Sequence, residues 1–146
     1  MRGDSDSRTS GLLQHMKEQE EAHLGALQGL VADRRARPTA LLPIWHVAGF
    51  ALGAGTALMG RAAAMACTVA VEESIGEHYN DQIRELLHRG YDEEELCAIL
   101  QINRDEELEH HDTALEEGAE STPGFGILKQ AIKAGCKVAI EVTKRV

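Results

Sequence analysis

Two Glu-x-x-His pairs and one isolated glutamate are the residues of this chain that could bind a metal ion. The pairs are Glu20–His23 and Glu107–His110, and Glu72 lies between them in an apolar stretch. A three-residue spacing places both members of a pair on one face of a helix, about one turn apart. Carboxylates and imidazoles without a thiolate are ligands that suit iron or manganese. The sequence therefore predicts a carboxylate-bridged metal site assembled from several helices.

All five residues fall on stripes of helical spacing that are otherwise mostly apolar. A lone carboxylate in such a stripe would cost on the order of several kcal/mol to desolvate, and a bound cation removes that cost. The stripes are Leu13, Met16, Glu20, His23, Leu27 and Leu30; Met65, Val69, Glu72, Gly76, Tyr79, Ile83 and Leu86; and Leu96, Leu100, Asn103, Glu107, His110 and Ala114.

Other histidines compete for the site. His111 lies four residues after Glu107 and could replace His110, but the spacing of the first pair favours His110. A third Glu-x-x-His pair, Glu85–His88, falls at an expected helix end, where the histidine complements the helix dipole. We therefore leave that pair outside the site.

Composition favours an all-α protein with a single domain over residues 1–146. The chain is 43% hydrophobic, has three prolines and only 3% aromatic residues, and is rich in Ala, Leu and Glu, which favour helices. The net charge of −9 argues against nucleic-acid binding, which needs clustered basic residues. Cys67, Cys97 and Cys136 lack the spacing of a metal finger, so we expect buried free thiols in a reducing compartment.

Breaks along the chain define the expected helices. Proline pushes the preceding residue out of helical geometry, glycine commonly ends a helix, and Asp or Thr commonly caps one. The helices are expected from Thr9 or Ser10 to about Arg35, from Leu41 to Leu58, from Ala62 to His88, from a cap at Asp92 to about Glu117, and from Thr122-Pro123 to about Arg145.

The segment Leu41–Gly60 contains no formal charge and has three interpretations. It could be a buried core helix, an interfacial helix that dips into one leaflet, or a membrane span. A span would separate the metal-bearing helices on opposite sides of the bilayer. Trp45 and the arginines at 34, 35 and 37 suit a headgroup region, so we favour the interfacial helix.

Tyr79 shares the stripe of Glu72 and is separated from it by Gly76. The missing side chain of the glycine would leave room for a substrate or dioxygen one turn from the metals. Tyr79 is therefore a candidate catalytic residue, and the alternative is a core tyrosine whose hydroxyl finds a backbone partner.

Several longer motifs resemble the demethoxyubiquinone hydroxylase family, the di-iron monooxygenases of ubiquinone biosynthesis. The resemblance extends from about Met16 to Val146. It rests on Arg37-Pro38-Thr39, Leu42-Pro43, the apolar run Val47–Leu58, the block AMACTVAVEESI at 64–75 and the block RDEELEHHDT at 104–113.

This resemblance implies a ferritin-like helical bundle with two iron ions. It implies that the ring of a polyprenyl quinone precursor is hydroxylated with dioxygen and with electrons from NADH. It also implies peripheral attachment to the matrix side of the mitochondrial inner membrane, beside a lipid-binding partner protein of a ubiquinone-biosynthesis complex.

The resemblance assigns the metal ligands to Glu20, His23, Glu72, Glu107 and His110. The family's remaining ligand, a Glu on its first helix, is expected ahead of residue 1, so the bundle here is expected to lack that helix. Residues 1–12 do not match it and are expected to be disordered.

The resemblance also places NADH at two basic residues near the C-terminus. These are Lys137 and Arg145, although Glu141 stands where a Tyr is expected. Two other functions remain open: a ferritin-like iron-oxidising protein, and a non-catalytic short form that binds quinone, membrane or a partner.

Overall fold

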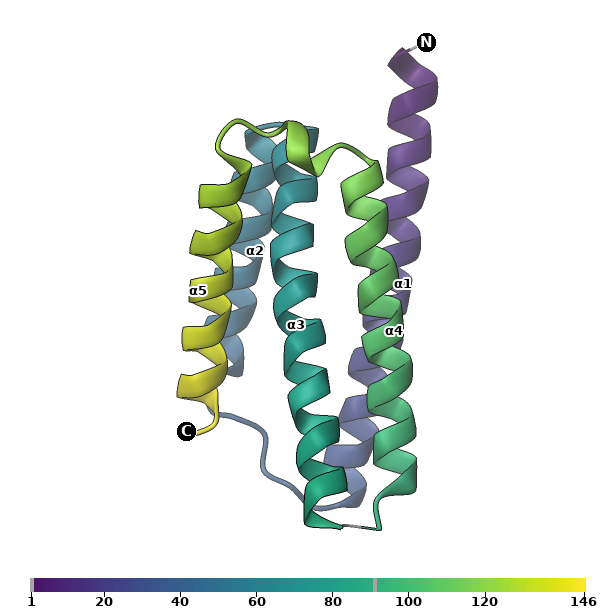
Figure 1. Ribbon diagram of the computed structural model, residues 1–146, viewed down its shortest axis with the longest axis vertical. Helices are drawn as coiled ribbons and strands as arrows, with labels where there is room; N and C mark the ends of the chain where they lie inside the picture. The colour runs from purple at the N-terminus through teal and green to yellow at the C-terminus, as the bar shows by residue number, and fades with distance from the viewer. Residues whose placement is uncertain (1, 91) are drawn as a thin grey trace. The chain divides into compact units, whose positions relative to one another are not determined.

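The computed structural model describes residues 2–90 and 92–146, with the side chains of 2–6 left aside. The described chain is helical and contains no strand, which confirms the all-α prediction. Its elements are α1 (Arg2–Asp33), α2 (Leu42–Leu58), α3 (Arg61–Arg89), α4 (Glu94–Glu116), the short 3-10 helix η1 (Ala119–Ser121) and α5 (Phe125–Thr143) (Figure 1). They form two compact units, Met1–Arg37 and Pro38–Val146, which we describe separately.

The first unit consists of α1 and the turn that follows it. Helix α1 begins at Arg2 rather than at Thr9 or Ser10, so residues that were expected to be disordered belong to the helix. No proline interrupts this part of the chain. The helix ends at Asp33, and Arg35 adopts a positive φ of 52° shortly before Pro38. The end thus falls two residues earlier than predicted.

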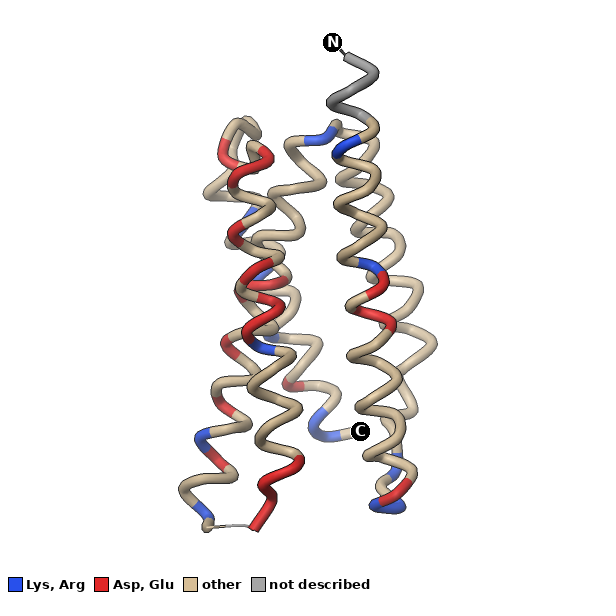
Figure 2. The backbone as a smooth tube through the Cα atoms, turned by 90° about the vertical axis from the view of Figure 1, so that its right-hand side faces the viewer, with Lys and Arg blue, Asp and Glu red and all other residues tan. Residues whose placement is uncertain are grey.

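Helix α3 is the centre of the second unit and packs against α2, α4, η1 and α5. In Figure 1 it lies between α4 and α5. One buried cluster joins α3 to α4 and η1 and contains Met65, Ala66, Val69, Ala114 and Ala119. Two further clusters contain Tyr79, Ile83 and Leu100, and Cys67, Ala70 and Ile132. Acidic residues follow α4 along much of its length (Figure 2).

The helix ends of this unit follow the sequence with three corrections. Gly90 closes α3 in the left-handed conformation at φ 65°, as expected. Helix α4 is preceded by Glu93 rather than by the predicted cap Asp92, and no side chain caps it. Helix α5 starts only at Phe125 after a left-handed Gly124, so Pro123 precedes it instead of occupying its first turn. The element η1 was not predicted.

Helix α2 is not a buried core helix, which corrects one of the three interpretations of its segment. Thr56 is its one fully buried residue, whereas Val47, Phe50 and Leu58 are 70%, 78% and 90% exposed. Its inner side reaches α3 and α5 through Leu52, and the Trp45 indole N–H donates a 2.8 Å hydrogen bond to the Thr143 hydroxyl. Among the described residues, none of the helices has the length and hydropathy to cross a bilayer. The interfacial interpretation stays a prediction.

Replacement of Val69 tests the packing of α3 against α4. It is fully buried, so Val69→Ala should lower the free energy of unfolding by about 2 kcal/mol through lost burial and a residual cavity. Val47→Ala, at an exposed position of α2, should change it by less than about 0.5 kcal/mol. Urea denaturation of both variants measures the difference. Equal effects would contradict the assignment of the core.

Candidate metal centre

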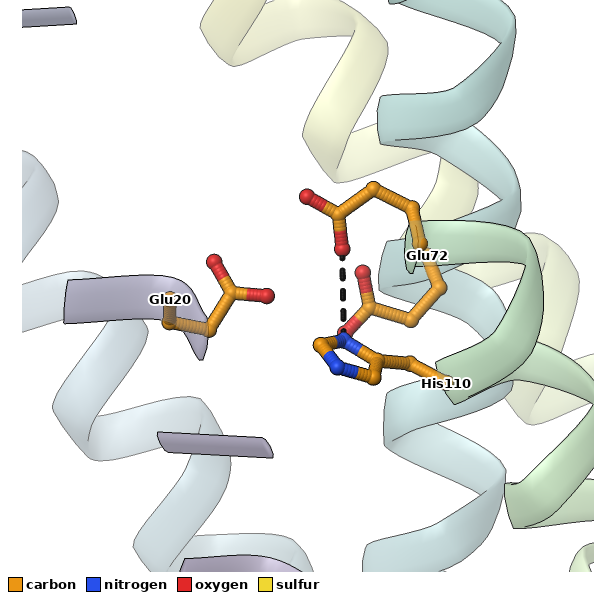
Figure 3. A group of neighbouring side chains, drawn as sticks. Glu20, Glu72 and His110 are labelled. Atoms are coloured by element: carbon orange, nitrogen blue, oxygen red, sulfur yellow. Dashed lines mark ion pairs between the residues drawn. The ribbon is translucent and has the colours of Figure 1, made fainter. Parts of the chain in front are cut away.

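Helices α3 and α4 bring Glu72, Glu107 and His110 together. Glu72 is half-buried, and Glu107 and His110 are each only 2% exposed. Each residue offers a ligand atom, and these atoms all lie within 4.8 Å of one another. Figure 3 shows the Glu72 and His110 side chains extending from the two helices into the same space. The structure thus assembles three of the predicted ligands.

Apolar contacts above and below the three residues, along the helix axes, determine how α3 and α4 are aligned with each other. Towards one end of the helices, Met65 and Val69 on α3 pack with Ala114 on α4. Towards the other end, Tyr79 and Ile83 on α3 pack with Leu100 on α4. The stripes predicted for α3 and α4 therefore face each other. Their polar residues lie between the two apolar clusters.

The trio fits a hard metal ion. The Glu107 Oε2 and His110 Nδ1 atoms lie 3.4 Å apart, one helical turn apart on α4. Desolvated carboxylates are costly unless a cation or hydrogen bonds offset the charge. Two carboxylates and one imidazole, without a thiolate, suit iron or manganese rather than copper(I). The donor set is thus consistent with one half of a carboxylate-bridged centre.

Glu20 and His23 belong to the first unit. On α1 the Glu20 Oε2 and His23 Nδ1 atoms lie 3.8 Å apart, which repeats the one-turn arrangement on α4. The spacing predicted for this pair is therefore present locally. That both pairs ligate one centre stays a prediction.

His111, the competing imidazole, faces away from the trio. Its Nδ1 lies 2.9 Å from Asp112 Oδ1, and its Nε2 lies 4.0 Å from Glu73 Oε2. The third pair is also outside the trio, because Glu85 forms an ion pair with Arg89 on the exposed surface of α3. Among the described residues, His110 rather than His111 lies with Glu72 and Glu107, and its role as a ligand stays a prediction.

Tyr79 is buried and accepts a 3.4 Å hydrogen bond from the side-chain amide of Asn103 on α4. Whether Tyr79 has a catalytic role or is a core tyrosine stays a prediction. At Gly76, between Tyr79 and Glu72, an added Cβ would meet no other described atom within 4 Å. The described chain therefore leaves space at the glycine, as predicted.

Lys137 and Arg145 line one open pocket on α5, with a volume of about 280 Å³. Lys137 Nζ also lies 3.8 Å from Glu77 Oε2 on α3. Glu141 lines the same pocket, and a hydrogen bond from Lys144 lowers the pKa of its carboxyl group. The two proposed nicotinamide-binding residues are thus neighbours, beside an acidic group.

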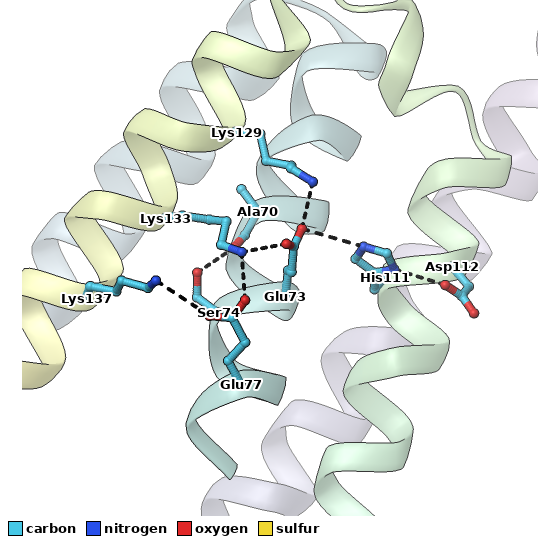
Figure 4. A network of polar contacts seen from close by, with 9 residues as sticks. All are labelled: Ala70, Glu73, Ser74, Glu77, His111, Asp112, Lys129, Lys133 and Lys137. Atoms are coloured by element: carbon cyan, nitrogen blue, oxygen red, sulfur yellow. Dashed lines mark hydrogen bonds and ion pairs between the residues drawn. The ribbon is translucent and has the colours of Figure 1, made fainter. Parts of the chain in front are cut away.

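The sequence analysis missed a charged cluster between α3 and α5. Lys129 and Lys133 bind Glu73, and Lys133 also binds Glu77 (Figure 4). Burial alone would raise the pKa of Glu73, but the hydrogen bonds from Lys129 and Lys133 lower it. A signal was present, because two lysines and two glutamates each recur at four-residue spacing.

All three cysteines are free thiols, as expected. Burial raises the pKa of Cys67 and of Cys136, so both favour the neutral thiol. Cys67 is fully buried, whereas Cys97 and Cys136 are only partly so.

Fold and site together define a helical protein with a buried carboxylate–histidine site. The family model described as ubiquinone biosynthesis protein COQ7 matches residues 1–143. The chain belongs to this family. The match includes residues 1–12, which corrects the expectation that they lie outside the resemblance.

Curated relatives agree with the family model. The chain is 57% identical over 140 residues to the 3-demethoxyubiquinol 3-hydroxylase of Rhodospirillum rubrum, covering 96% of this chain and 65% of the relative. It is 54% identical over 135 residues to the mitochondrial NADPH-dependent 3-demethoxyubiquinone 3-hydroxylase of Rattus norvegicus, covering 92% and 62%. It is 40% identical over 147 residues to the mitochondrial 5-demethoxyubiquinone hydroxylase of Saccharomyces cerevisiae, covering 92% and 63%. The chain thus spans a little under two thirds of the length of these relatives.

Replacement of Glu72 tests the metal centre. Glu72→Ala should weaken Fe(II) or Co(II) binding by about 100-fold or more, because it removes a direct ligand rather than an outer partner. Helix content should change little, since the apolar contacts of α3 remain. Isothermal titration and circular dichroism measure the two effects.

The matched control is the double variant Glu85→Ala/His88→Ala. It removes a Glu-x-x-His pair of the same spacing from the same helix and should leave metal affinity unchanged. Loss of affinity in the control, or its retention in Glu72→Ala, would contradict this site.

Proposed function

We propose that the protein hydroxylates the ring of a demethoxy polyprenyl quinol in ubiquinone biosynthesis. The observation that carries the proposal is the buried trio Glu72, Glu107 and His110 in a chain of this family. With Glu20 and His23 from α1, these residues would hold a pair of iron ions. The relatives are named as hydroxylases, which favours hydroxylation over iron oxidation or a non-catalytic role.

The reaction balances with one molecule of dioxygen. A ring C–H bond becomes C–OH, the second oxygen atom leaves as water, and two electrons and two protons are supplied. When bound, the iron pair supplies the coordination positions and redox capacity that dioxygen chemistry requires.

The protein's own residues would hold the metals and shape the space beside them. Glu72 on α3 and the pair on α4 fix the ligand oxygens and the imidazole, and the apolar clusters on both sides limit access of water. The space at Gly76 would admit the quinol ring. The Tyr79 hydroxyl, held by Asn103, would then contact the substrate.

A nicotinamide cofactor is the proposed electron donor. Lys137 and Arg145 share a pocket and could bind its phosphates, although Glu141 weakens the positive potential there. Several relatives are named as NADPH-dependent, so NADPH is a candidate electron donor in addition to NADH.

The apolar surface of α2 would bind the isoprenoid tail and the membrane. Its exposed large side chains are Leu42, Ile44, Val47, Phe50 and Leu58. Because α2 lacks the length and hydropathy to cross a bilayer, it would lie in the interface. With mitochondrial relatives, this supports peripheral attachment at the matrix side of the inner membrane, beside a lipid-binding biosynthetic partner.

The hydroxylation is tested with isotopically labelled dioxygen. The iron-loaded protein, a short-tailed demethoxyquinol and a chemical reductant should give a product that carries one labelled oxygen on the ring by mass spectrometry. Glu72→Ala should lower the yield by about 100-fold or more, as loss of a group central to catalysis does. Unlabelled product, or none from the iron-loaded wild type, would refute the proposed activity.

Membrane attachment is tested with a charge at Leu58. Leu58→Glu places a carboxylate where acyl chains would lie and should lower liposome binding about tenfold or more. Leu87→Glu, at a 68% exposed leucine near the end of α3, is the matched control and should bind like the wild type. Flotation with anionic liposomes measures both. Equal binding of the two variants would exclude α2 as the attachment surface.

A further inference from the structure

Lys133 lies almost buried between α5 and α3, with only 8% of its surface exposed. Its ammonium group donates hydrogen bonds of 2.5 Å to Glu73 Oε1 and 2.8 Å to Glu77 Oε1. Lys129 approaches the other oxygen of Glu73 at 2.8 Å, and His111 on α4 faces that oxygen at 4.0 Å. Glu73 therefore binds two lysines of α5 and lies opposite His111 of α4. It is adjacent in sequence to the proposed metal ligand Glu72.

The geometry of α3 connects this cluster to Glu72. Each residue advances about 100° around a helix, so Glu73 and Glu77 lie about 100° and 140° from Glu72. Met65 and Val69, which share a buried cluster with Ala114 of α4, lie within about 60° of Glu72. Helix α3 thus contacts α4 and α5 through two different faces, and the second face fixes its rotation about its own axis.

The polar contacts restrict this rotation more than the apolar ones do. On the α5 face, the buried members of the apolar cluster are Cys67, Ala70 and Ile132, and the two that α3 contributes are small. Small side chains allow a helix to turn slightly without losing much contact area. Hydrogen bonds between charged groups weaken steeply once distance and angle depart from their preferred values.

We propose that Lys133 is a positioning residue of the metal centre. By holding Glu73 and Glu77 it sets the rotation of α3, and thereby directs Glu72 towards Glu107 and His110. It also occupies the carboxylate of Glu73, which keeps that carboxylate on the α5 side of the helix. This inference rests on the proposed metal centre and adds a residue that does not touch the metal.

The test compares Co(II) affinity with stability. Lys133→Met keeps the length of the side chain, removes the charge and should lower Co(II) affinity about tenfold, as loss of an outer partner does. Lys133→Arg keeps the charge and both hydrogen bonds and should restore most of the affinity. Glu73→Gln is a milder change and should also lower Co(II) affinity. In the Glu73→Gln variant, the additional change Lys133→Met should lower the affinity little further.

The matched control is another ion pair of α3. Arg61 lies eleven residues before Glu72 and binds Glu117 at 3.2 Å, so Arg61→Met removes a contact between α3 and a neighbouring segment far from the site. It should lower thermal stability without changing Co(II) affinity. The visible absorption of bound Co(II), which reports ligand geometry, should change in Lys133→Met and remain unchanged in Arg61→Met.

The outcomes separate this inference from the proposed function. Unchanged Co(II) affinity and spectrum in Lys133→Met and Glu73→Gln, with only a lower melting temperature, would overturn the positioning role and leave the metal centre intact. Failure of the wild type to bind Co(II) would refute the metal centre and this inference with it. If Lys133→Met does not fold, Glu73→Gln decides.

Discussion

The packing of α3 against α4 is the constraint on which the site depends. Two apolar clusters, one towards each end of the helices, set the position of α3 along α4. Of the polar residues between them, Glu107 and His110 are buried, so their contact with water is small. A small residue at the contact, Ala114 on α4, lets the helices approach closely. The same packing that stabilises the fold therefore creates an environment in which a bound cation is strongly favoured.

Charge is distributed differently on the two sides of α3. Towards α4 it presents Glu72 to a second carboxylate and an imidazole, an arrangement that suits a metal ion. Towards α5 it presents Glu73 and Glu77 to lysines, which neutralise them within the protein. Adjacent glutamates thus take opposite roles because one residue step on a helix turns the side chain by about 100°.

Among the helices of its unit, α2 has the most exposed large apolar side chains. Its inner side contributes Leu52 to the core and its Trp45 bonds to α5, while its large side chains face outward. A soluble surface rarely carries such a patch without a partner. The polyprenyl substrate of the proposed function would need apolar surface of this kind.

Composition and helical periodicity predicted the all-α class and selected Glu72, Glu107 and His110 as candidate ligands, and proline, glycine and capping residues predicted most helix ends. Local spacing suffices for these because one turn of a helix fixes which side chains share a face. Only the tertiary structure decided that α2 is exposed, that His111 faces Glu73 instead of the trio, and that Lys129 and Lys133 hold Glu73. These contacts join residues up to 60 positions apart, and which face of one helix meets which face of another depends on packing that no local pattern encodes.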